Sequence, residues 1–174
     1  MDKPYNAHNC SSLFGYAQQV HERSAGICQL CGCNAGSTVD FDLWRQFTWE
    51  HIIGESQGGY LKEIQEVVAQ RFPDLPQLQV RELAKRIEAA NTVTACSFCN
   101  STTSREHAPA TMNDLILHAQ GSPDDVVKAV ETELQQILAK KRERVRWKID
   151  AVREAFEKKV ASVLNQKRQA SSHM

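Results

Sequence analysis

The sequence predicts an α+β protein that is mostly helical, with a few short strands, an inserted pair of helices and a long C-terminal helix. Three observations lead to this prediction. Two C-x-x-C pairs, Cys28–Cys31 and Cys96–Cys99, lie far apart in the chain. Short runs rich in β-branched and aromatic residues stand near these pairs. Apolar residues recur every three or four positions in residues 60–91 and 125–165, which is the spacing of helices.

The composition excludes several classes of protein. With 174 residues the chain has the length of one domain with a helical appendage, and its 41% hydrophobic and 24% charged residues are typical of a globular protein. No apolar run approaches the ~20 residues that cross a bilayer. The first ten residues lack the charged and then apolar order of a signal peptide. We therefore expect a cytoplasmic protein that does not enter a membrane.

The first part of the chain predicts helices, turns and strands in alternation. A helix is expected over residues 12–24, with Gly26 after its end. The first cysteine pair should form a tight turn. Residues 39–53 predict two short strands that break near residues 44–46, and residues 54–59 predict a loop.

The second part is mainly helical. Helices are expected over residues 60–71 and 76–91, and the prolines between them should separate the two. A short strand should then lead into the second cysteine pair and a helix. Asn113 should open another short helix, and Gly and Pro in residues 121–123 should separate it from a long helix over about residues 125–165.

The apolar stripe of the long helix has two interpretations. It is either a face that packs on its own domain or the seam of a coiled-coil homodimer. Lys141 interrupts the stripe. The last six residues, QASSHM, should fray.

The two C-x-x-C pairs predict a closed tetrahedral zinc site, because each pair turns two thiolates toward one point and zinc takes four ligands. A redox site would need only one pair and a following helix. Cys33 is an alternative ligand. Otherwise Cys33 and Cys10 are ordinary small residues.

Three segments occur in a characteristic order: GICQLCG at 26–32, WEHIIGESQGG at 49–59 and ANTVTACSFCN at 90–100. Together they resemble the HNH, or ββα-metal, endonuclease family, in the branch braced by a four-cysteine zinc site. The resemblance implies a small zinc-braced ββα-metal nuclease core within residues 1–110, with a helical insertion at about 60–90. Residues 111–174 would be a C-terminal helical extension outside the family pattern.

The resemblance also implies a function and a set of site residues. The protein would be a metal-dependent DNA endonuclease that leaves 5′-phosphate and 3′-hydroxyl ends. His51 matches the general base, Glu50 and Asn100 match the ligands of a catalytic Mg²⁺ or Mn²⁺, and Asn91 matches the asparagine that fixes the loop. The structural zinc ligands would be Cys28, Cys31, Cys96 and Cys99.

These residue types suit phosphodiester hydrolysis on chemical grounds. Histidine, with an ordinary pKa of ~6.5, can deprotonate water near neutral pH. Carboxylate and amide oxygens suit a hard divalent cation, which offsets charge at the phosphate and at the leaving oxygen.

The sequence departs from the family pattern at several positions. Glu50 stands where aspartate is usual, and Gly54 where proline is frequent. Roughly thirty residues separate the second and third segments, where a short loop is usual. Thr103 takes the place of a frequent lysine, so Arg105 is the expected phosphate contact instead. His107 is an alternative metal ligand.

The charge distribution is compatible with DNA as a partner. The whole chain carries 21 basic and 21 acidic residues, yet residues 124–168 hold 12 basic and 8 acidic ones, a net charge of +4. Within this region the run KKRERVRWK, residues 140–148, has six basic residues and one acidic residue. We expect phosphate contacts from Lys140, Lys141, Arg142, Arg144 and Arg146. The alternative is a solvated helix face without a ligand.

Two other functions remain open at this point. One is a non-catalytic zinc-braced DNA-binding module in which Glu50 and His51 are structural. The other is a helical oligomerisation protein with a zinc-stabilised head. The joint presence of a base, two metal-ligand candidates and a loop asparagine favours the nuclease, because a binding module does not need all four.

Overall fold

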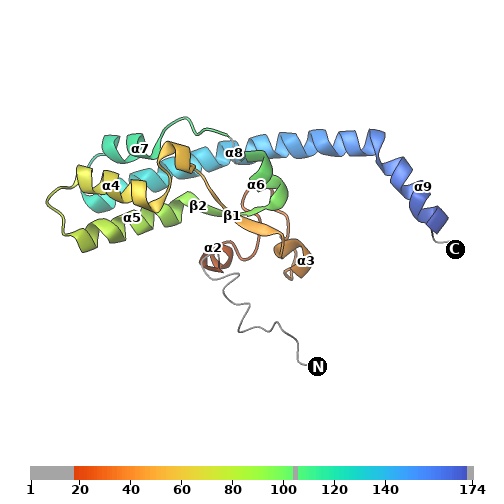
Figure 1. Cartoon of the computed structure of the whole chain (residues 1–174), viewed down its shortest axis with the longest axis horizontal. Coiled ribbons are helices and arrows are strands. Elements are labelled where there is room, and N and C mark those ends of the chain that lie inside the picture. Colours follow the sequence, from red (N-terminus) through yellow and green to blue (C-terminus); the bar gives the residue numbers. More distant parts are fainter. Residues whose placement is uncertain (1–17, 104–105, 172–174) are drawn as a thin grey trace, which may run out of the picture.

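The computed structural model describes residues 18–103 and 106–171, and it is an α+β protein made mostly of helices (Figure 1). Its elements are α2 (Gln18–Arg23), α3 (Phe41–Trp44), β1 (Phe47–His51), the 3₁₀ turn η2 (Glu55–Gln57), α4 (Leu61–Arg71), α5 (Gln77–Asn91), β2 (Thr92–Cys96), α6 (Ser97–Thr103), α7 (Met112–His118), α8 (Pro123–Lys159) and α9 (Ala161–Ser171). The part of the expected first helix before residue 18 lies outside the described residues. The described part is helical.

The two strands form an antiparallel sheet at the middle of the molecule. Phe47 pairs with Cys96 at one end of the ladder, and His51 pairs with Thr92 at the other. Helix α5 leads into β2 without a loop, and β2 leads into α6 in the same way. The expected helices at 60–71 and 76–91, and the strand and helix around the second cysteine pair, are therefore confirmed.

The prediction of two strands in residues 39–53 is wrong for the first strand. Residues 41–44 form the short helix α3, because the Asp40 carboxylate caps it. Asp40 Oδ1 accepts hydrogen bonds from the backbone N–H groups of Asp42 at 2.8 Å and Leu43 at 3.2 Å. Aspartate in this role favours a helix start even where the apolar pattern suggests a strand.

The hydrophobic core joins the sheet to four helices. Helix α4 packs against α5 and α7, and α8 packs against α5 and α7. The largest fully buried side chains are Ile52, Ile53, Ile64, Val68, Val80, Ile87, Met112, Ile116, Val126, Val127, Leu134 and Leu138. Residues from both sides of the boundary expected near position 110 share this core. That boundary stays a prediction.

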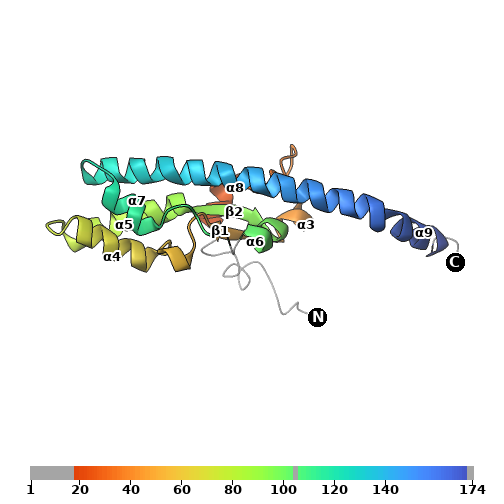
Figure 2. The same cartoon turned by 90° about the horizontal axis from the view of Figure 1, so that it is seen from above.

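Helix α8 runs along the whole body and then projects past it (Figures 1 and 2). It begins at Pro123, and Ser122 forms a capping box with Asp125. The expected helix to residue 165 is broken at Val160, where φ is −121° and ψ is −44°. Helix α9 follows and extends the projection.

The projecting part exposes apolar side chains. Val152, Phe156, Val160, Val163 and Leu164 are each at least 40% exposed. No helix among the described residues is long and apolar enough to cross a membrane.

Candidate functional site

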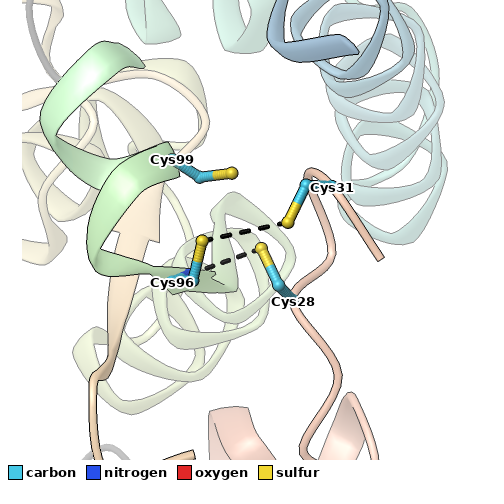
Figure 3. Close-up of side chains that lie close together, drawn as sticks. All are labelled: Cys28, Cys31, Cys96 and Cys99. Atoms are coloured by element: carbon cyan, nitrogen blue, oxygen red, sulfur yellow. Dashed lines mark hydrogen bonds between the residues drawn. The ribbon is translucent and has the colours of Figure 1, made fainter. Parts of the chain in front are cut away.

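Four cysteines from distant parts of the chain converge at the sheet (Figure 3). The sulfur atoms of Cys28, Cys31, Cys96 and Cys99 all lie within 4.8 Å of one another, and Cys31 Sγ is 3.8 Å from Cys96 Sγ. A tetrahedral metal with sulfur bonds of ~2.3 Å has sulfur–sulfur edges of about 3.8 Å. The cluster can therefore hold a metal ion such as zinc.

The sheet itself places the two cysteine pairs. The first pair lies in a turn in which the Gly32 N–H donates to the Cys28 carbonyl at 2.8 Å. Gln29 attaches this turn to β2 through two bonds with Thr94: its N–H donates to the Thr94 carbonyl at 2.9 Å, and its side-chain Oε1 accepts from the Thr94 N–H at 3.0 Å. Cys96 ends β2 and Cys99 lies in α6, so the second pair faces the first.

The thiols influence one another strongly. Hydrogen bonds with Cys31, and then with Cys96 and Cys99, lower the pKa of the Cys28 thiol, whereas hydrogen bonds with their neighbours raise the pKa of the Cys31 and Cys99 thiols. Cys33 is not one of the four converging residues. Burial raises the pKa of its thiol to about 12. The geometry therefore favours the two C-x-x-C pairs over Cys33.

A second polar group of residues lies at the end of β1. Glu50 and His51 are each 8% exposed. Both line a small cavity of about 80 Å³. The other lining residues are Gly54, Ser56, Gln57, Glu106, His107 and Lys141. The structure thus brings together the expected base, one expected metal ligand and the alternative ligand His107.

His51 is held by aromatic rings. Its ring centroid lies 4.7 Å from that of Trp49 and 4.4 Å from that of Tyr60. Its Nε2 atom is buried and has no hydrogen-bond partner among the described residues. Burial, and then the charge of Lys141, lower the pKa of His51 to about 4. The imidazole is therefore neutral at pH 7.

Glu50 is a buried carboxylate, and Lys141 is its one ion-pair partner in the part of the chain that the structure describes. Burial raises its pKa, while the charge of Lys141 and a hydrogen bond with Thr103 oppose this shift. Lys141 Nζ lies 3.8 Å from Glu50 Oε1. The same ammonium donates to the backbone carbonyl of His51 at 3.3 Å.

Asn91 is completely buried and holds the chain that follows β1. Its Oδ1 accepts from the Ile53 N–H at 2.8 Å, and its Nδ2 donates to the carbonyls of Ile53 and Gly59, both at 2.9 Å. A Cβ atom at position 59 would come within 1.7 Å of the Ile53 carbonyl oxygen, so this turn requires glycine. These contacts fix the loop beside Glu50 and His51.

Asn100 lies near this group but is not one of the residues that line the cavity. Its Nδ2 donates to Thr48 Oγ1 at 3.0 Å. Thr48 is two residues before Glu50, and alternate strand residues share a face. Asn100 and Glu50 therefore lie over the same face of the sheet.

Sequence reasoning missed Glu106. This carboxylate lines the cavity and binds two cations of α8, with Lys148 Nζ at 2.5 Å and Arg144 at 3.5 Å. The nearby Lys148 and Arg144 overcome the effect of burial, and the pKa of Glu106 is lowered. No local pattern in the sequence singles it out, because its partners Arg144 and Lys148 lie on α8, 38 and 42 residues further along the chain.

The expected phosphate-binding residues separate into different environments. Lys141 was expected on the exposed basic face, and the structure corrects this placement because the side chain is buried against Glu50. Arg142 Nε donates to the Gln29 carbonyl at 2.6 Å, and Arg144 pairs with Glu106. Lys140 is exposed.

A groove of about 480 Å³ lies between the first cysteine turn and α8. Arg142, Arg146 and Arg153 are among its lining residues. Arg105 lies outside the described residues, so its expected phosphate contact stays a prediction.

No protein-family model, curated protein or solved structure matches this chain.

Proposed function

We propose that the protein is a metal-dependent DNA endonuclease whose active site is the cavity lined by Glu50 and His51. The observation that carries this proposal is the buried His51 Nε2, which has no partner among the described residues and belongs to a neutral imidazole next to a buried carboxylate. An unpaired buried nitrogen is costly in a folded protein, and a bound water, ion or substrate at the site would satisfy it.

In this proposal His51 takes the proton of the attacking water. The aromatic contacts of Trp49 and Tyr60 hold the imidazole in place, and its lowered pKa keeps the ring unprotonated at neutral pH. Asn91 keeps the loop after β1 in register. These contacts supply the positioning that hydrolysis requires.

The donor atoms fit a hard divalent cation. Glu50 offers a carboxylate oxygen, and Asn100 has its amide nitrogen committed to Thr48, which leaves its amide oxygen as the ligand atom. When bound, Mg²⁺ or Mn²⁺ would offset negative charge on the phosphate and on the leaving 3′ oxygen. Hydrolysis by this route would leave 5′-phosphate and 3′-hydroxyl ends.

Zinc in the four-cysteine cluster would act as a structural brace. It would join the turn at Cys28 to β2 and α6 in a zinc-braced ββα-metal core, and so hold Glu50 and Asn100 over one face of a sheet with only two strands. A sheet this small does not hold its geometry alone. DNA would contact Lys140 and the groove that contains Arg142 and Arg146, through backbone phosphates.

Plasmid cleavage tests the proposal and separates it from a non-catalytic DNA-binding module. Supercoiled plasmid should be nicked or linearised with Mg²⁺ or Mn²⁺ and remain intact with EDTA, and DNA ligase should reseal the products because their ends are 5′-phosphate and 3′-hydroxyl. A binding module would retard DNA in a gel without cutting it under any of these conditions.

We also propose that a second copy of the chain covers the projecting helix. Val152 and Phe156 continue the apolar stripe of α8 past the body, and Val160 at the break and Val163 in α9 follow at intervals of four and three residues. An exposed apolar stripe on a projecting helix is typical of an interface. The same patch on two copies can pair with itself around a two-fold axis.

A further inference from the structure

Lys141 is a buried charge in the middle of an apolar helix face. It is 5% exposed and lies between the buried Leu138 and Val145, whereas its neighbour Lys140 is exposed. Removing an ammonium from water is costly unless a compensating charge or hydrogen bond accompanies it. A lysine in this position therefore has a purpose that an apolar residue could not fulfil.

The structure shows what compensates this charge. Lys141 donates one hydrogen bond, to the His51 carbonyl at 3.3 Å, and its one ion pair is with Glu50 at 3.8 Å, as far as the described residues show. The other acid of the cavity, Glu106, is engaged by Lys148 and Arg144. Lys141 is thus the cation that α8 provides for Glu50.

This placement has a consequence for the metal. Two cations that share one carboxylate within about 4 Å repel each other strongly in a partly buried site. An ammonium beside Glu50 supplies the opposite charge to this carboxylate when no divalent cation is present. It must also reduce the affinity of Glu50 for a divalent cation.

We propose that Lys141 is a resident cation of the site, which neutralises Glu50 in the metal-free protein and competes with Mg²⁺ or Mn²⁺ for that carboxylate. The inference rests on the proposed function in one respect, namely that Glu50 is a ligand of the divalent cation. In this proposal a residue of α8 directly lowers the affinity of the site for the metal, although α8 lies outside the nuclease core of the family pattern.

Mn²⁺ binding by the full-length, zinc-loaded protein tests this inference without DNA. Titration followed by electron paramagnetic resonance gives the Kd for the wild type and for K141M, with K140M as the matched control that loses the same charge from the exposed side of the helix. K141M should bind Mn²⁺ about 5- to 150-fold more tightly, the usual range for coupled sites. K140M should bind as the wild type does, and E50Q should lose this binding.

Thermal denaturation provides a second readout. K141M removes the ion-pair partner that the described residues give to the buried Glu50, so the Tm of this variant without Mn²⁺ should fall below that of the wild type. Saturating Mn²⁺ should raise the Tm of K141M by more than it raises the wild-type Tm. K141Q removes the charge but keeps a donor for the His51 carbonyl. It should also bind Mn²⁺ more tightly, and it serves if K141M does not fold.

The outcomes separate this inference from the proposed function. If E50Q abolishes Mn²⁺ binding while K141M and K141Q keep the wild-type Kd, Lys141 is only a structural ion-pair partner and the inference is overturned, although the metal site stands. If E50Q binds Mn²⁺ as the wild type does, Glu50 is not a ligand. In that case the inference and the catalytic-metal part of the proposed function both fail.

Discussion

Replacing Asn91 with alanine should be among the most damaging single changes in this protein. The side chain is fully buried and takes part in three hydrogen bonds of 2.8–2.9 Å, with the Ile53 N–H and with the carbonyls of Ile53 and Gly59. The substitution leaves three backbone groups without partners inside the protein. Each such group costs about 1–3 kcal/mol.

The expected loss of stability is well below the sum of the maximum costs of the three unpaired backbone groups, because the loop can relax and water can reach these groups. We expect the free energy of unfolding to fall by about 3–5 kcal/mol, the upper range for single substitutions. For a chain of this size each kcal/mol shifts Tm by roughly 2–4 °C, so Tm should fall by roughly 6–20 °C. Urea denaturation of the zinc-loaded protein measures the same loss directly.

Asn100→Ala is the matched control for this prediction. It makes the same chemical change at a half-buried position, where it removes one side-chain hydrogen bond, to Thr48. We expect a loss of only about 0.5–1.5 kcal/mol. An Asn91→Ala variant no less stable than Asn100→Ala would refute the view that Asn91 organises the loop beside the site.

Three further predictions concern the metal cluster, the DNA surface and the projecting helix. Cys96→Ser should lower both the zinc content, measured by elemental analysis, and the Tm, and chelation of the wild type should have the same two effects. A Cys96→Ser variant with normal zinc content and normal Tm would contradict the structural metal site. A variant with Lys140, Arg142 and Arg146 all changed to Gln should keep its zinc but bind DNA more weakly. The slope of log Kd against log salt should fall by about one unit for each phosphate that is no longer neutralised. An unchanged slope would mean that these residues form a solvated face without a ligand. Phe156→Glu should shift the protein from dimer to monomer in sedimentation equilibrium without changing the zinc content, and a wild type that is monomeric at all concentrations would exclude the proposed second copy.

Local signals explain why much of the fold is predictable from the sequence. Helices α4 and α5 follow from apolar spacing and from the prolines between them, and the start of α8 follows from the break at Gly121-Ser122-Pro123, although the residue that caps it is Ser122 and not the expected Asp124 or Asp125. Such signals act within a few residues. Asp40 gave a similar local signal for α3, but the apolar residues after it suggested a strand instead.

Long-range placement is what the sequence does not reveal. The two cysteine pairs predict their own convergence because one metal would need all four thiols, and the structure confirms that they converge. Nothing comparable shows that Lys141 points inward while Lys140 points outward, or that Glu106 meets Lys148. These contacts depend on the rotation of α8 about its axis and on its distance from β1, which the packing of the whole core decides. The break at Val160 likewise could not be predicted, because no proline or glycine lies near it in the sequence.

Cleavage by a His51→Ala variant tests the central claim most directly. His118, which lies on the exposed side of α7, provides the matched control for the loss of an imidazole. His51→Ala should bind zinc and DNA as the wild type does but cleave plasmid about 10²- to 10⁴-fold more slowly in Mg²⁺, the usual effect of losing a general base, while His118→Ala should cleave at the wild-type rate. Cleavage by His51→Ala at the wild-type rate would contradict the assignment of the active site to the cavity at the end of β1.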